Sequence, residues 1–277
     1  MMFASLMVRL LPGASNDAVL DLAADLAGRL GARRVIGIAA CQPLQVYGGP
    51  EAYVPQDLID RDIAQVEGDL GHAEERFRAR LGKTAAVEWR STITNRSLAD
   101  YIVYQARAAD LLITGSEEGG TVLDTSRRVS LADLVLKAGR PLLVAGANVS
   151  RLDVKSVVVG WKDSREARRA AADALPLLKL AERVTVVQIA AKDEIDDARA
   201  CTDDVAAWLG SHGIAAVARS ELKIGDDAEQ LATIATELGA GLLVGGAYGH
   251  TRVREWVLGG VTRDLLLQPA ACSLLSH

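Results

Sequence analysis

The sequence predicts a doubly wound α/β fold that is built twice along the chain. Short apolar runs rich in Val, Ile and Leu alternate with segments of helical periodicity. The strand runs are continuously apolar, as expected for parallel strands that are buried on both faces of a sheet. The alternation also repeats, because Ala109–Gly115 (ADLLITG) resembles Ala240–Gly246 (AGLLVGG).

The first half is expected to contain five strands that alternate with four helices. Asn16 and Asn95 are candidate N-caps for the first and third helices, and Gly31 is a stop signal for the first. The predicted strands are Ser5–Leu11, Arg33–Ala40, Val87–Ser91, Asp110–Gly115 and Leu142–Ala145. The predicted helices are Asp17–Leu30, Gln56–Leu81, Asn95–Ala108 and a fourth that ends near Ala138.

The second half repeats this order. The predicted strands are Ser156–Trp161, Arg183–Ala190, Ala216–Leu222, Gly241–Gly246 and Cys272–Leu275. The predicted helices are Ser164–Leu180, Ile195–Ser211, Asp227–Leu238 and a fourth that ends near Gln268. We therefore expect two domains, 1–150 and 151–277. The first is the longer, and its extra residues fall between Gln42 and Leu81.

Composition excludes several classes of protein. The net charge is -5, which argues against a nucleic-acid binder that works through a basic face. No apolar run approaches the roughly 20 residues that span a bilayer, and the apolar start of the chain lacks the basic region of a signal peptide. The three cysteines are far apart and form no metal or redox pair. A cytoplasmic protein is the simplest expectation.

Two glycine clusters follow the fourth strand of the second half. Gly246 and Gly249 come first, and Gly259 and Gly260 follow after a loop, directly before a predicted helix. Glycines allow backbone N–H groups to approach a phosphate, and a helix N-terminus attracts negative charge. The spacing is consistent with a polyphosphate site, and also with ordinary turn glycines in a chain that has 25 glycines.

The segment Leu242–Thr262 (LLVGGAYGHTRVREWVLGGVT) resembles the nucleotide loop of the universal stress protein family, Gly-x2-Gly-x9-Gly after a fourth buried strand. The resemblance covers both halves and implies the tandem form of the family. It implies two Rossmann-like domains, of the adenine nucleotide alpha hydrolase-like type, with strand order 3-2-1-4-5. In the family the fifth strand commonly pairs between subunits. The halves are therefore expected to form a pseudo-dimer, and a homodimer of chains is left open.

The resemblance also implies a site for ATP, with or without Mg²⁺. Residues of the two glycine clusters would hold ribose and phosphates, Ile189 would lie near the adenine through its backbone, and the loop after the first strand would close the base and ribose side. The full set of candidate residues is Gly160, Trp161, Lys162, Asp163, Ile189, Gly246, Gly249, His250, Gly259, Gly260, Val261 and Thr262.

The sequence departs from the family pattern at two places. Gly260 stands where the family has Ser or Thr, although Thr262 offers a hydroxyl nearby. Lys162 stands where ATP-binding members have Asp, and Lys cannot accept a hydrogen bond from ribose or adenine. Lys162 would contact a phosphate, pair with Asp163 or be solvated.

The first half is expected to have lost the site. Glu118 falls near the place of Gly249, and Arg127 and Arg128 fall in the place of Gly259 and Gly260. A carboxylate would repel phosphate, and the two arginines would fill the space, although Arg side chains can also bind another anion.

No catalytic triad, metal-ligand cluster or Gly-x4-Gly-Lys-Ser/Thr loop is found in the sequence. The resemblance implies a nucleotide-binding stress-response module, and with no catalytic signature in the sequence, slow ATP hydrolysis is the only enzymatic activity left open. The alternative is a dimeric scaffold of the same fold that binds no nucleotide, or another small molecule.

Overall fold

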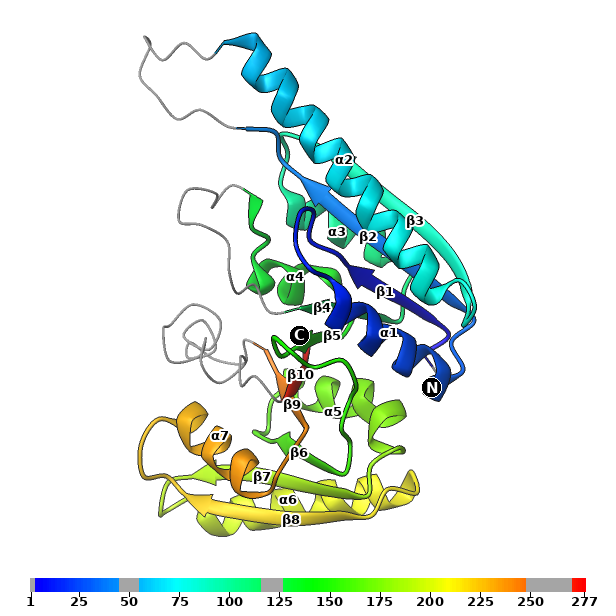
Figure 1. Ribbon diagram of the computed structural model, residues 1–277. Coiled ribbons are helices and arrows are strands. Elements are labelled where there is room, and N and C mark those ends of the chain that lie inside the picture. The colour runs from blue at the N-terminus through cyan, green and yellow to red at the C-terminus, as the bar shows by residue number, and fades with distance from the viewer. Residues whose placement is uncertain (1–2, 45–54, 116–126, 248–270) are drawn as a thin grey trace.

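A computed structural model describes residues 3–44, 55–115, 127–247 and 271–277 (Figure 1). Within these residues the first half alternates five strands with four helices, as predicted. The strands are β1 (Ser5–Arg9), β2 (Arg34–Cys41), β3 (Ala86–Ile93), β4 (Leu111–Gly115) and β5 (Leu142–Ala145). The helices are α1 (Asp17–Leu30), α2 (Gln56–Leu81), α3 (Leu98–Ala106) and α4 (Leu131–Ala138).

The second half repeats the pattern within the described residues. Its strands are β6 (Ser156–Gly160), β7 (Arg183–Ala190), β8 (Ala216–Leu222), β9 (Leu242–Gly246) and β10 (Cys272–Ser276). Its helices are α5 (Arg165–Leu178), α6 (Ile195–Ser211) and α7 (Asp227–Glu237). The fourth helix predicted for this half lies outside the described residues.

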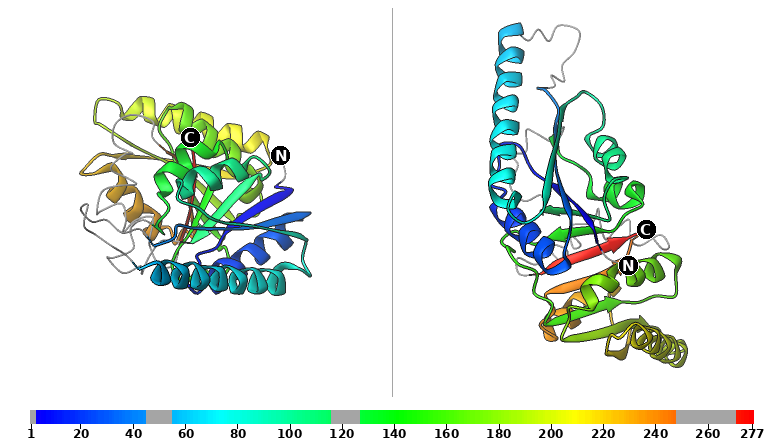
Figure 2. Two further views of the ribbon diagram at one scale, coloured as in Figure 1. Left: turned by 90° about the horizontal axis from the view of Figure 1, so that it is seen from above. Right: turned by 90° about the vertical axis from the view of Figure 1, so that its right-hand side faces the viewer.

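The ten strands form one sheet of order β3-β2-β1-β4-β5-β10-β9-β6-β7-β8. Each half therefore has the predicted order 3-2-1-4-5, and neighbours within a half are parallel. The halves meet where β5 and β10 pair antiparallel, with Leu143 opposite Leu274. Figure 2 shows β10 in the middle of the molecule, between the strands of the two halves. The predicted pseudo-dimer is thus confirmed as one continuous sheet.

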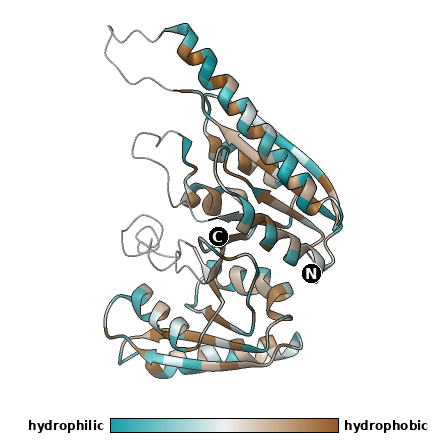
Figure 3. Ribbon diagram, viewed as in Figure 1, coloured by the Kyte–Doolittle hydropathy of each residue, from teal (hydrophilic) through white to brown (hydrophobic). Residues whose placement is uncertain are grey.

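Helices cover both faces of this sheet because its strands are apolar on both sides (Figure 3). One core lies under α1, α2, α5 and α6 and includes residues from both halves, such as Leu143, Val159 and Leu274. On the opposite face, α3 and α4 cover a second core, which also includes Leu275 from the second half. A smaller core lies under α7. The aliphatic composition of the strands explains how a chain with 4% aromatic residues fills these cores.

Three ends of two helices, α1 and α3, show how well local sequence signals predict helix boundaries. Gly31 ends α1 with a φ of 63°, a left-handed conformation that glycine adopts without strain, as predicted. The prediction that Asn95 caps α3 is wrong, because Ser97 is the cap and accepts a hydrogen bond from the Asp100 N–H at 3.2 Å. Asn16 precedes α1 as predicted, but its side chain makes no capping bond.

Candidate functional site

The switch point of the second half lies between β6 and β9, because β6 is flanked by β7 on one side and β9 on the other. The chain connections leave these neighbouring strands in opposite directions across the sheet. Open parallel sheets bind ligands in the crevice at the carboxyl ends of such strands. The candidate residues Gly160 and Gly246 therefore lie where a sheet of this type is expected to bind a ligand, at the carboxyl ends of β6 and β9.

Three glycines meet at this edge of the sheet. Gly160 and Gly245 are register partners at the ends of β6 and β9, and Gly246 follows directly. A Cβ atom on Gly246 would lie 2.5 Å from the Ala167 backbone nitrogen. Only glycine therefore allows the end of β9 to touch the first turn of α5. A Cβ on Gly160 would meet the flexible end of Leu231 at 2.7 Å.

The loop between β6 and α5 is held at both of its ends. The Trp161 N–H donates to the Val187 carbonyl at 2.7 Å, and the Ser164 hydroxyl caps α5 by accepting from the Ala167 N–H at 3.2 Å. The Trp161 ring packs against the core that faces α5 and α6. Its indole Nε1 is buried and has no hydrogen-bond partner among the described residues. Trp161 therefore acts here as an anchor for the loop.

Lys162 and Asp163 are exposed at the tip of this loop. The Asp163 carboxylate pairs with Arg168 in α5. The structure gives Lys162 no carboxylate partner within the described ranges, and the suggested pair with Asp163 is not formed. The Lys162 ammonium is thus available at the carboxyl edge of the sheet.

Ile189 lies near the end of β7, partly buried against the core under α7. Alternate residues of a strand present their backbone groups to the same side, so Ile189 faces β6 as Val187 does. The last bond on that side joins Trp161 to Val187, and no described backbone group bonds Ile189 there. The N–H and C=O of Ile189 therefore face the crevice beyond the end of β6.

Sequence reasoning missed Glu166, which lies in the first turn of α5 with 8% of its surface exposed. Its own backbone N–H, Arg165 and Ser164 lower the pKa of its carboxyl, against the effect of burial. The Arg165 Nη2 lies 3.0 Å from its Oε1. An acidic residue in a first helical turn was the available signal. This carboxylate already occupies the N-terminus of α5, so phosphate is not expected there.

The remaining candidate residues lie outside the described residues. They are Gly249, His250, Gly259, Gly260, Val261 and Thr262. The described segment ends at Ala247, whose N–H donates to the Ser276 carbonyl at 2.8 Å. A ring nitrogen of His277 lies 3.0 Å from the Ala247 carbonyl oxygen. The end of β9, which leads into these remaining candidate residues, is thus fixed against β10.

The corresponding edge of the first half keeps one glycine, Gly115, and carries side chains at the other two positions. Arg9 and Thr114 are 4% and 1% exposed, and Arg9 Nη1 donates to Thr114 Oγ1 at 3.3 Å. Arg127 pairs with Asp62 of α2, with oxygens at 2.6 and 2.7 Å, and the Leu44 N–H donates to the same carboxylate. Arg128 is exposed, and Glu118 lies outside the described residues. Arg9 is a second residue that sequence reasoning missed.

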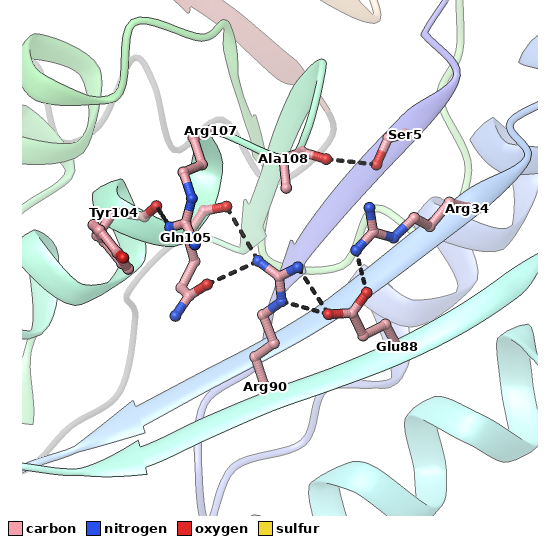
Figure 4. A network of polar contacts seen from close by, with 8 residues as sticks. All are labelled: Ser5, Arg34, Glu88, Arg90, Tyr104, Gln105, Arg107 and Ala108. Carbon is pink, nitrogen blue, oxygen red and sulfur yellow. Dashed lines mark hydrogen bonds and ion pairs between the residues drawn. The ribbon is translucent and has the colours of Figure 1, made fainter.

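A further polar network lies away from both switch points. Arg90 donates to Glu88 and to the side chain of Gln105, and Glu88 also pairs with Arg34 (Figure 4). These contacts join β2, β3 and α3 towards the amino ends of the strands. They stabilise the packing of these elements away from the carboxyl ends of the strands, where sheets of this type bind ligands.

The described residues contain neither a cluster of metal ligands nor a membrane-spanning helix. No group of three His, Cys, Asp or Glu side chains there could hold a metal ion. No helix in those residues is long and apolar enough to cross a membrane. No disulfide joins Cys41, Cys201 and Cys272, which all lie in the described part of the chain.

No protein-family model and no curated protein sequence matches the chain. Solved structures do. A universal stress protein from Archaeoglobus fulgidus DSM 4304 superposes with a TM-score of 0.72 at 15% identity, covering 98% of this chain and 95% of that one. A functionally unknown protein from Pseudomonas aeruginosa PAO1 superposes with a TM-score of 0.59 at 14% identity, covering 99% and 92%. Similarity over the whole length includes both repeats, so the chain has the tandem fold of the universal stress proteins.

Proposed function

We propose that the chain is a tandem universal stress protein whose second half binds an adenine nucleotide, with ATP as the expected ligand. Two observations support the proposal: Gly160, Gly245 and Gly246 lie at a switch point of the sheet, and the sequence has the glycine spacing of the family's nucleotide loop. The first half serves as the partner that completes the ten-stranded sheet.

The meeting of Gly160, Gly245 and Gly246 at one edge is the observation that carries the proposal. Gly160 and Gly245 place no side chain between the two strand ends, and Gly246 lets the first turn of α5 pack against β9, which supports the approach of a nucleotide to the backbone there. The first half has Arg9 and Thr114 in place of Gly160 and Gly245 and keeps glycine only at Gly115, so the fold does not require two of the three glycines.

The described residues suggest how the ligand would lie. The free backbone groups of Ile189 suit the polar edge of a base, and the exposed Lys162 ammonium suits a phosphate. The Glu166 carboxylate keeps phosphate away from the N-terminus of α5. The phosphates would then lie towards Gly249, Gly259, Gly260 and Thr262, and any Mg²⁺ would arrive with the nucleotide.

Gly246 provides the test, and Gly115 provides the matched control. Both end the fourth strand of their half, yet a Cβ on Gly115 would meet nothing within 4 Å. We expect Gly246→Ala to displace β9 from α5 and to weaken ATP binding by about tenfold or more, as measured by calorimetric titration. We expect Gly115→Ala to bind ATP as the unmodified chain does.

Circular dichroism of both variants shows whether the fold is kept. Failure of the unmodified chain to bind any adenine nucleotide at millimolar concentration would leave the alternative, a scaffold that works without a nucleotide. Equal affinity of the two glycine variants would instead show that the ligand lies elsewhere.

A further inference from the structure

Strand register identifies equivalent positions in the two halves. Leu6 pairs with Leu111 as Val157 pairs with Leu242, and Val8 pairs with Ile113 as Val159 pairs with Val244. One residue further along, Arg9 and Thr114 therefore correspond to Gly160 and Gly245. The two switch points differ at the two positions where a ligand would approach most closely.

Arg9 is the last residue of β1, and its long side chain is almost wholly enclosed, at 4% exposure. It bonds across the switch point to Thr114, which is itself 1% exposed. Both side chains lie on the face covered by α3 and α4, because Met7 and Leu112, two residues earlier, belong to that core. A flat guanidinium group is thus enclosed in the crevice of the first half.

The loop after β1 is closed as well. Asn16 accepts from the Leu11 N–H at 2.8 Å and donates to the carbonyls of Leu11 and Ala14 at 3.0 and 3.1 Å. An amide side chain has two donor hydrogens, and both are used within this loop. In the second half the corresponding loop is shorter and ends at the Ser164 cap.

We propose that Arg9 is a built-in occupant of the first-half crevice, held there by Thr114, so that this half stays closed to ligands. The proposal rests on the nucleotide site proposed for the second half, and it fixes the capacity of the chain at one nucleotide. It also assigns the closure to Arg9, whereas the sequence pointed to Arg127 and Arg128. The Arg127 guanidinium instead pairs with Asp62.

A built-in occupant has a functional consequence. The first half keeps its switch point filled at all times, while the second half alternates between a filled and an empty crevice. The ligand therefore acts on one side of the β5–β10 joint only. The first half therefore stays in one state at this joint, whether or not the second half holds a ligand.

Chemical rescue tests the occupant directly. Arg9→Gly removes the whole side chain, and the space that is left includes the former place of the guanidinium group. We expect methylguanidinium to raise the unfolding temperature of Arg9→Gly above its effect on the unmodified chain. We expect methylammonium, a cation without the planar group, to have no such effect. If the variant folds poorly, methylguanidinium present during refolding should increase the yield of folded protein. Absence of rescue in both assays would overturn the proposal.

Stoichiometry tests the closure. Equilibrium dialysis with ATP should give one bound nucleotide per unmodified chain, and Arg9→Met, which keeps a long side chain in the crevice, should also give one. Two nucleotides per unmodified chain would overturn the proposal. Zero would count against the nucleotide site of the second half, and the rescue experiment would still decide the role of Arg9.

Discussion

We infer that single residues decide which of two frameworks with the same strand register can accept a ligand. The backbone registers of β1–β4 and β6–β9 match, yet one switch point carries Arg9 and Thr114 and the other carries Gly160 and Gly245. Backbone pairing does not depend on these side chains, so the fold can be kept while the crevice is filled. Function in this fold is therefore set by side chains at the strand ends.

Glu166 gives a prediction at the same scale. Its pKa is lowered in the folded state from the ordinary value of 4.5, chiefly by its own backbone N–H and then by Arg165 and Ser164. A lowered folded-state pKa stabilises the protein above the unfolded-state pKa, and this contribution is lost as pH falls through the folded-state value. We expect Glu166→Gln to lower the free energy of unfolding near neutral pH, with a difference that shrinks towards pH 3.

Urea unfolding of the two proteins between about pH 3 and pH 7 measures this difference. Glu182 is exposed, and Glu182→Gln is the matched control. A constant difference between Glu166→Gln and the unmodified chain over this range would contradict the assignment.

At the scale of elements, periodicity and turn residues predicted every described strand and helix, together with their order. They did so because apolar runs and glycine stops are local properties, as at Gly31. The missed features depend on partners far away in the chain. The role of Arg9 requires Thr114, which is 105 residues distant, and Asn16 is used by its own loop instead of by α1. Tertiary packing determines these hydrogen-bond partners, so the spacing of residues in the sequence does not predict them.

The start of α3 allows a direct comparison of two candidate caps. The Ser97 hydroxyl accepts from the Asp100 N–H at 3.2 Å, whereas Asn95 lies before the helix. We expect Ser97→Ala to lower the free energy of unfolding by about 1 kcal/mol, because an N–H of the first turn loses its acceptor. We expect Asn95→Ala to change it by less than about 0.5 kcal/mol. Denaturant titration measures both, and the opposite order would restore Asn95 as the cap.

At the scale of the whole molecule, the sequence predicted two domains with a boundary near residue 150, and the structure adds how closely the halves are joined. β5 and β10 pair at the centre of one sheet, and the largest core contains Leu143 of the first half and Leu274 of the second. The boundary itself stays a prediction, as do the cytoplasmic location and the homodimer. Part of the candidate site lies in 248–270, outside the described residues, so the glycine spacing remains the argument for that part.

The shared core predicts that the two halves unfold together. Leu274 is fully buried in β10, opposite Leu143, so its truncation removes contacts from both halves at once. We expect Leu274→Ala to lower the free energy of unfolding by about 2–5 kcal/mol while a single transition is kept. Calorimetry should give equal calorimetric and van't Hoff enthalpies for the unmodified chain. Ile224, which is 87% exposed, is the control, and Ile224→Ala should leave the transition almost unchanged. Two separate transitions in the unmodified chain would show that the two halves unfold independently, despite the pairing of β5 with β10. One transition would show that the two halves unfold as a unit, so that any ligand that binds only the folded second half would stabilise the first half as well.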